Sequence, residues 1–216
     1  MAQILDIQMR GKRFADLTSS AFRTKLVKIA NRLGLDPSAL ATIMMFETAT
    51  TMSPAIQNPY TKATGLIQFM PQTARNMGTT VDTLKSMSAV DQLDWVDKYF
   101  QPWAGRLRTP HAHYLAVFLP SLMGTALDHV VATKGSSLYD QNSGFDGSKK
   151  GYYTTGDIVY PITSAYAAAQ ARPPIYVSGF DWMSPVRIGG LAFVFGSVGA
   201  ALGYGVAWST KVVGIR

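Results

Sequence analysis

The chain has 216 residues, enough for one sizeable domain or for a domain with an appendage. It has no cysteine, which excludes disulfides and thiolate metal sites, and its 47% hydrophobic content is high for a soluble protein, so part of it is expected to face something other than water. The net charge of +7 favours an acidic partner: nucleic acid, anionic lipid or the carboxylate-bearing bacterial wall. Its Lys and Arg residues are scattered, which disfavours specific nucleic-acid binding.

Residues 1–18 are predicted to form a separate N-terminal segment. Ile4 and Leu5 are its main apolar pair before charge returns, and the segment lacks the apolar run and cleavage site of a secretory signal. If the protein works outside a cytoplasm, we expect it to be carried there by a route other than a secretory signal.

Two helices are predicted next. Residues 20–33 carry apolar side chains at three- and four-residue spacing, and Gly34 is well placed to terminate that helix. Asp36 and Pro37 then have the residue types of an N-cap and a first helical position. The second helix is expected to end between Glu47 and residue 50.

The remainder of residues 19–172 is predicted to be a mainly helical domain. Residues 51–64 contain prolines, Asn and Ser without a sustained period and indicate a loop. A short helix is expected at Pro71, and a longer one after Ser88, which stands three residues before Asp91 as in a capping box. Residues 111–131 indicate a further helical segment that Pro120 kinks or breaks, and no strand alternation is evident before residue 150.

The tail, residues 173–216, differs in kind. Residues 188–208 are 21 residues without a charge, which predicts a C-terminal transmembrane helix. Arg187 and Lys211 flank the stretch, and Gly199 and Gly203 form a GxxxG pattern that lets another helix approach. The alternative is a buried Gly-rich hairpin of the soluble core, because the stretch holds six glycines.

Glu47 is the one acidic residue between Phe46 and Pro71. It follows an apolar run and is expected at the negative end of a helix dipole, and both conditions favour the protonated carboxyl and raise its pKa. A general acid that works near neutral pH needs such a group. The alternative is a surface Glu at a helix end.

The residues that follow resemble a known family. Glu47-Thr48, a polar loop with Ser53-Pro54 and Asn58-Pro59, and then Thr64-Gly65-Leu66-Ile67-Gln68-Phe69-Met70-Pro71 look like the catalytic core of the lytic transglycosylases. That family shares a lysozyme-like fold with goose-type lysozymes and cleaves bacterial peptidoglycan. The resemblance covers roughly residues 20–135, and the chain departs from the Gly-Leu-Met-Gln block at Ile67 and Phe69, both apolar.

The resemblance implies roles for individual residues. Glu47 matches the catalytic acid, and Thr48 matches a hydroxyl residue that holds the carboxyl or the substrate. The implied substrate-binding set is Thr48, Gly65, Gln68, Phe69, Met70 and Tyr114; Gln68 would bond an N-acetyl sugar, and Phe69 and Met70 fit a core role as well as a contact. The family also has a Tyr that bonds the catalytic Glu. If Phe118 takes that position the hydroxyl is missing, and Tyr114 is the candidate to replace it.

The resemblance also implies the chemistry. Ordinary glycosidases use two carboxyl groups. In this family one Glu protonates the oxygen between N-acetylmuramic acid and N-acetylglucosamine and then removes a proton from the muramic C6 hydroxyl, which closes a 1,6-anhydro ring without a cofactor. If water attacks instead, the same site is a lysozyme.

Residues 146–157 look like an EF-hand calcium loop. Asp146, Gly151 and Asp157 stand at positions 1, 6 and 12 of that pattern. Position 5, however, is Lys150, a cation where an oxygen ligand belongs, and Asp157 is shorter than the usual Glu. We therefore expect a degenerate, structural loop and no metal site.

Three hypotheses follow. In the first, the chain is a bacteriophage virion enzyme that opens the cell wall for genome delivery, with peptidoglycan as substrate, membrane contact through residues 188–208 and other virion proteins as neighbours. The stretch Tyr114 to Ser121 and the degenerate loop resemble phage versions of the domain. In the second, it is a phage endolysin held at the inner membrane. In the third, it is a non-catalytic structural or membrane-channel protein that retains a lysozyme-like domain.

Overall fold

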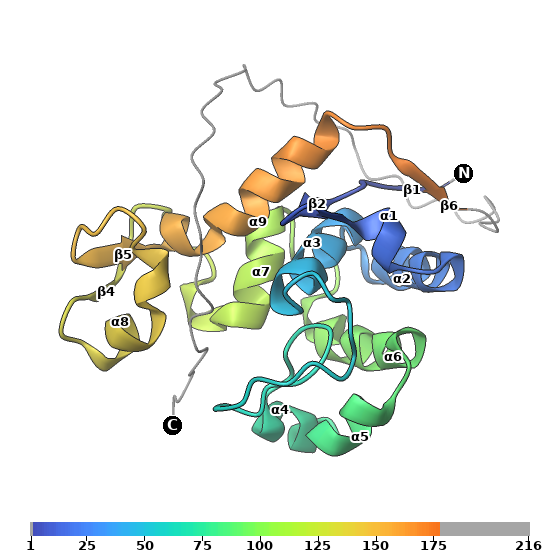
Figure 1. Cartoon of the computed structure of the whole chain (residues 1–216), viewed down its shortest axis with the longest axis horizontal. Coiled ribbons are helices and arrows are strands. Elements are labelled where there is room, and N and C mark those ends of the chain that lie inside the picture. The colour runs from blue at the N-terminus through green and yellow to red at the C-terminus, as the bar shows by residue number, and fades with distance from the viewer. Residues whose placement is uncertain (1, 178–216) are drawn as a thin grey trace.

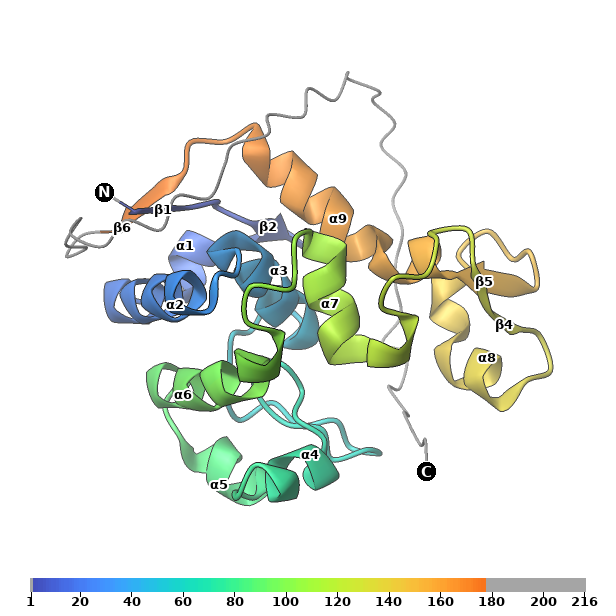
Figure 2. The same ribbon diagram turned by 180° about the vertical axis from the view of Figure 1, so that it is seen from behind.

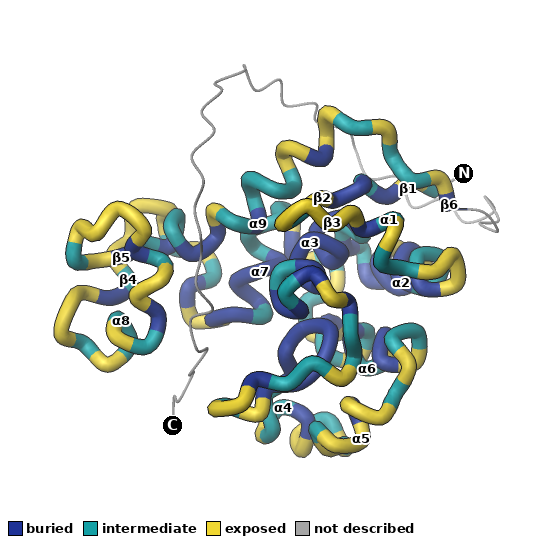
Figure 3. The backbone as a smooth tube through the Cα atoms, viewed as in Figure 1, coloured by how far each residue is buried: buried dark blue, intermediate teal, exposed yellow. Residues whose placement is uncertain are grey.

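Helix α3 (Pro37–Glu47) lies at the centre of the fold (Figure 1). The computed structural model describes residues 2–177. Helix α3 contacts α2 (Ser20–Leu33), α7 (Pro110–Phe118) and α9 (Thr155–Gln170). Its side chains are buried except for Pro37 and Phe46, which are partly exposed (Figure 3). The residue that ends α3 is therefore carried into the packed interior.

Local capping explains where the first helices begin and end, and it confirms their predicted boundaries. The Ser19 hydroxyl accepts a hydrogen bond from the Phe22 amide at the start of α2, and Gly34 closes that helix with a left-handed φ of +63°. The Asp36 carboxylate accepts from the Ser38 amide at the start of α3. Ser88 caps α6 (Ala89–Phe100) by accepting from the Asp91 amide, as the capping-box spacing predicts.

Helices α4 to α6 form the lower part of the molecule (Figures 1 and 2). Helices α4 (Pro71–Asn76) and α5 (Val81–Ser86) are short, and η1 (Gln101–Trp103) continues α6. Helix α6 packs on α2, and ion pairs link their surfaces: Lys25 with Asp94 at 2.8 Å, and Arg32 with Asp97. The long loop between α3 and α4 carries the Gly65–Pro71 block.

The helical segment expected over residues 111–131 does break at Pro120, as one of the two expected outcomes, but the prediction that it stays helical to residue 131 is wrong. Helix α7 ends at Phe118 because Leu119, the residue before Pro120, adopts φ −155° and ψ 86°. A 3-10 turn, η2 (Pro120–Leu122), follows, and β4 (Val130–Thr133) then pairs antiparallel with β5 (Tyr152–Thr154). Helix α8 (Ser137–Asn142) and the turn η3 (Ser143–Phe145) lie between those strands and complete a small lobe beside α7.

Short strands also occur near the N-terminus, where none was expected. Strand β1 (Ala2–Ile4) pairs with β6 (Ile175–Val177), and β2 (Gln8–Met9) pairs with β3 (Lys12–Arg13) ahead of α1 (Phe14–Leu17). Segments of two to four residues are too short to display a period of two. Ile4, Ile7 and Phe14 belong to the same buried core as α3, so residues 2–17 and 175–177 pack with the helical domain.

The predicted membrane span, residues 188–208, lies outside the described residues. Within residues 2–177, no helix has the length and hydropathy that crossing a bilayer requires.

Candidate active site

Glu47 is the last residue of α3, and only 7% of its surface is exposed. A chain that turned away gradually would leave this carboxyl loosely held. Instead the backbone turns sharply: Ala49, Thr50 and Met52 have φ values of +50°, +63° and +52°. Left-handed backbone is uncommon outside glycine, especially for a β-branched residue, and costs about 1 to 3 kcal/mol per residue. Strain therefore accumulates immediately after the predicted catalytic acid.

The Thr48 side chain holds this turn together. Its hydroxyl donates to the Met44 carbonyl at 2.6 Å and accepts from the Met52 amide at 3.0 Å. Thr48 is completely buried, so its hydroxyl is engaged by the chain itself. The arrangement lets Thr48 fix the position of Glu47 through the backbone.

Two tyrosines lie close enough to Glu47 to feel its charge. Burial is the larger cause of their pKa shifts and the charge of the Glu47 carboxylate is the smaller one. Together they raise the pKa of Tyr99 to about 12 and the pKa of Tyr114 well above its usual value. Tyr99 comes from α6 and donates its hydroxyl to the Ala116 carbonyl of α7 at 2.8 Å. Tyr114 comes from α7 and is 1% exposed. Tyr99 of α6 and Tyr114 of α7 are thus near enough to the end of α3 for the Glu47 charge to act on both.

The structure distinguishes the roles of Tyr114 and Phe118. Phe118 lies one turn beyond Tyr114 on α7 and stacks on it, with ring centroids 5.7 Å apart. Tyr114 also meets Phe46, the neighbour of Glu47, edge to face at 5.5 Å. Tyr114 therefore brings a phenol near Glu47, and Phe118 backs its ring.

Gly65 is fixed by a close approach to Gln92 of α6. Its φ is +80°, and a β-carbon there would lie 2.2 Å from the Gln92 Oε1 atom. Gln92 is completely buried; its Oε1 accepts from the Leu66 amide at 2.7 Å, and its Nε2 donates to the carbonyls of Leu84 and Pro54 at 2.8 and 3.1 Å. One side chain of α6 therefore holds both arms of the loop between α3 and α4.

Gln68 and its neighbours form the inner edge of that loop. Gln68 has a φ of +53° and is 6% exposed, and its Nε2 donates to the carbonyls of Gly65 and Ile56 at 3.1 and 3.4 Å. Phe69 is buried and meets Tyr99 edge to face at 6.1 Å, while Met70 is half-buried and precedes α4. Phe69 thus connects the loop to the tyrosine beside Glu47.

Sequence reasoning missed Gln92 and the part that Tyr99 plays. In the sequence Tyr99 shows only the spacing of the apolar stripe of α6, alongside Leu93, Val96 and Phe100. The one local signal for Gln92 is a polar residue beside Leu93 on that stripe. The two of its partners that belong to the loop between α3 and α4 stand 26 and 38 positions earlier in the chain, beyond the reach of a periodicity argument.

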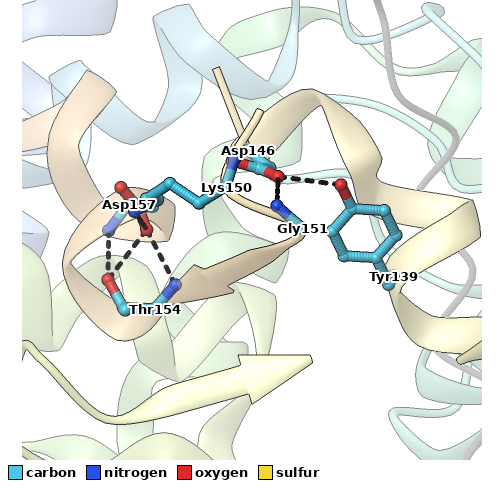
Figure 4. Close-up of polar contacts among 6 residues, drawn as sticks. All are labelled: Tyr139, Asp146, Lys150, Gly151, Thr154 and Asp157. Carbon is cyan, nitrogen blue, oxygen red and sulfur yellow. Dashed lines mark hydrogen bonds and ion pairs between the residues drawn. The ribbon is translucent and has the colours of Figure 1, made fainter. Parts of the chain in front are cut away.

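In the EF-hand-like loop, Asp146 and Asp157 stand at the two ends. Both carboxylates are bonded to donor groups of the chain itself (Figure 4). Asp146 accepts from the amides of Lys150 and Gly151 at 2.8 and 2.7 Å and from the Tyr139 hydroxyl at 2.8 Å. Burial opposes its charge, but these donors lower its pKa. The Lys150 ammonium binds Asp157 at 2.9 Å, and residues 2–177 contain no cluster of three or more His, Cys, Asp or Glu side chains that could hold a metal ion.

Comparison with known proteins bears on the first half of the chain. The family model for the transglycosylase SLT domain matches residues 26–104, a range that includes Glu47, the Gly65–Pro71 block, Gln92 and Tyr99 and stops before Tyr114. Neither the curated proteins nor the solved structures yielded a match. The match supports lytic transglycosylase activity on peptidoglycan. Residues 26–104 therefore match the transglycosylase SLT domain, a family model of the lytic transglycosylase and lysozyme-like superfamily.

Proposed function

We propose that the protein is a peptidoglycan lytic transglycosylase that cleaves the β-1,4 bond between N-acetylmuramic acid and N-acetylglucosamine, with Glu47 as acid and then base. The observation that carries this is the placement of Glu47: a buried carboxyl inside an SLT domain, held by a strained turn and faced by the phenols of Tyr99 and Tyr114.

The first step needs a proton donor at the glycosidic oxygen. In the proposed step Glu47 enters as the protonated carboxyl group and acts as the general acid. As the bond breaks, Glu47 gives its proton to the departing N-acetylglucosamine oxygen, and the N-acetyl group of the substrate supports the electron-poor C1 of the muramic residue.

The second step returns the proton to Glu47. The Glu47 carboxylate removes the proton of the muramic C6 hydroxyl, whose oxygen bonds to C1 and closes the 1,6-anhydro ring. No water enters the balance, and one carboxyl serves both steps. Residues 48–70 contain no Asp or Glu, so the neighbouring loop offers no second carboxylate.

The other predicted residues support this chemistry in different ways. Thr48 acts on Glu47 through the turn that its hydroxyl closes. Gly65 lets the loop approach Gln92. The Nε2 atom of Gln68 donates to the Gly65 carbonyl inside the loop, so Gln68 contacts the sugar through its Oε1 atom. Phe69 packs beneath Tyr99, and Met70 leads into α4.

Product analysis tests the proposal. Purified sacculi are incubated with the wild-type protein and with Glu47→Gln, and released muropeptides are separated and weighed by mass spectrometry. We expect anhydro-muropeptides from the wild type and none from the variant. Reducing-end products would identify a hydrolytic lysozyme or endolysin instead, and equal or absent release from both proteins would leave a non-catalytic structural role.

We further propose that the protein acts from a phage virion at the host cell envelope, with membrane contact through residues 188–208. The uncharged stretch, the net charge of +7 and the similarity of the Tyr114–Ser121 stretch to phage domains support this. Detection of the chain in purified particles, and flotation of the full chain with anionic vesicles, are the expected results. A protein found only in lysates of infected cells would favour the endolysin.

A further inference from the structure

Residues 57–64 form a stiff projection, here named the finger. Its base is closed by the Gln57–Thr64 bridge and by a hydrogen bond from the Asn58 amide to the Ala63 carbonyl at 2.8 Å. Figures 1 and 2 both show this part of the α3–α4 loop reaching out below α7 on the side of the lobe that carries β4, β5 and α8.

Asn58 makes the finger rigid. It is 4% exposed, and its Oδ1 accepts from the amides of Tyr60 and Thr61 at 2.9 and 3.1 Å. The Lys62 amide bonds to the Asn58 carbonyl at 3.0 Å, and Lys62 adopts a left-handed φ of +59°.

The tip presents an aromatic ring and a cation to solvent. Tyr60 is 76% exposed, the highest value among the exposed large apolar side chains of residues 2–177. Lys62 is exposed too, and its ammonium has no ion pair or hydrogen bond within the same residues.

The finger is fixed to the candidate active site at its base. The Gly65 amide donates to the Ile56 carbonyl at 2.8 Å, and Gln68 donates to the same carbonyl. Gln92 holds Pro54 on one arm and Leu66 on the other. Tyr60 and Lys62 are therefore held at a constant place relative to the Gly65–Gln68 block.

We propose that the finger is a second contact site for the glycan strand, away from the bond that is cut. The Tyr60 ring packs against the C–H face of a sugar, because the negative face of an aromatic ring attracts the positive hydrogens of that face. Lys62 pairs with a carboxylate of a stem peptide. This inference rests on the proposed function for the identity of the polymer.

Binding to sacculi tests the inference without catalysis. The full chain carrying Glu47→Gln serves as parent, and its retention on purified sacculi is measured against increasing sacculus concentration. We expect Tyr60→Ala to weaken binding about fivefold and Tyr60→Phe to bind like the parent, because stacking needs the ring and not the hydroxyl. Tyr176→Ala is the matched control: Tyr176 is 61% exposed on β6, and its loss is expected to change nothing.

A second substrate separates the two contacts. Sacculi treated with an amidase keep the glycan and lose the stem peptides. On intact sacculi Lys62→Ala is expected to weaken binding about two- to threefold. Amidase leaves a free lactyl carboxylate on each muramic residue, so the test on the treated glycan is that the Tyr60→Ala loss persists there. Binding of Tyr60→Ala equal to that of the parent, or an equal loss in Tyr60→Phe, would overturn the stacking contact.

The experiments distinguish a failure of the proposed lytic activity from a failure of the finger as a contact site. A wild-type protein that binds sacculi with the expected Tyr60 dependence but releases no anhydro-muropeptide would refute the lytic activity and leave the finger as a wall-binding site. A parent that does not bind sacculi, beside a wild type that releases anhydro-muropeptides, would overturn the finger as a contact site and leave the lytic activity standing.

Discussion

The side chain of Gln92 lies so close to Gly65 that no β-carbon fits between them. Gln92 is buried in α6 and bonds to both arms of the loop that follows Glu47. The pair therefore couples the conformation of the substrate-side loop to the helix that also carries Tyr99. Disturbing either residue is expected to affect the loop and the active site together.

Gly65→Ala is expected to lower the free energy of unfolding by about 2 to 4 kcal/mol. The methyl group adds a clash with a buried, hydrogen-bonded side chain to the strain of a left-handed residue. Urea denaturation followed by circular dichroism measures the loss. Gly78→Ala is the matched control: its φ is +81° but a β-carbon there meets nothing within 4 Å, so about 1 kcal/mol is expected. Equal losses would show that Gln92 yields freely.

Thr48→Val is expected to lower stability by about 1 to 3 kcal/mol and activity more than tenfold. Valine keeps the shape of threonine but leaves the buried Met52 amide without its acceptor, which loosens the turn that fixes Glu47. Release of muropeptides and thermal unfolding are measured in parallel. Thr51→Val, at an exposed position of the same turn, is expected to cost less, because water can replace the hydrogen bonds of its hydroxyl to the Thr48 carbonyl and from the Ser53 amide. Full activity in a destabilised Thr48→Val would refute the positioning role.

Tyr99→Phe is expected to cost about 1 kcal/mol of stability, since it removes the hydrogen bond that joins α6 to the Ala116 carbonyl of α7. Because the pKa of Tyr99 is raised to about 12, this bond should persist in alkaline solution to above pH 10. Ultraviolet titration of tyrosinate absorbance, compared between the two proteins, checks the value. Loss of an ordinary tyrosine titration near pH 10 in Tyr99→Phe would contradict it.

His113 is expected to make the fold sensitive to mild acid. Its Nδ1 lies 2.8 Å from the Thr109 carbonyl, and its Nε2 accepts from the Asp36 amide, so the ring is neutral at the start of α3. Burial lowers the pKa of His113, although the Thr109 carbonyl and the Asp36 charge oppose the shift; the neighbouring His111, whose pKa burial also lowers, acts in the same direction as burial.

The sign of the pH effect follows from proton uptake. Below about pH 6.5 an unfolded histidine binds a proton that the folded one refuses, so stability is complete above that pH and falls as pH drops toward the folded-state pKa. Urea midpoints at pH 7.5 and 5.5 measure the loss. His113→Gln should reduce the difference, with His111 retaining a part, whereas His129→Gln, at an exposed site, should leave it unchanged.

Features with local causes could be predicted from the sequence. Ser19, Gly34, Asp36 and Ser88 act within four residues of their own positions, and the helices they bound were found where expected. The break at Pro120 follows from the same local reasoning, but what replaces the helix after it does not. Strands β4 and β5 are three or four residues long and pair across α8, so their stability depends on tertiary contacts.

The residues of the candidate site also fall into two groups: those that a local sequence pattern reveals, and those whose partners are distant in the chain. Glu47 and the Gly65–Pro71 block stand close together in the chain and form a recognisable pattern. Tyr99 and Gln92 reach the site from α6, and their importance depends on partners that the fold alone brings near: the Ala116 carbonyl for one and the Leu66 amide for the other. Burial of a polar side chain is visible only once these partners are in place.

The pairing of β1 with β6 has a mechanical consequence. Ala2 lies opposite Val177 and Ile4 opposite Ile175, so the two ends of the described chain leave the ladder at the same side. Tension applied between those ends would peel the strands apart one hydrogen bond at a time instead of shearing all of them at once. A pull on residue 177 would thus detach β6 at low force, while α3 and the Glu47 carboxyl stay clamped between α2, α7 and α9.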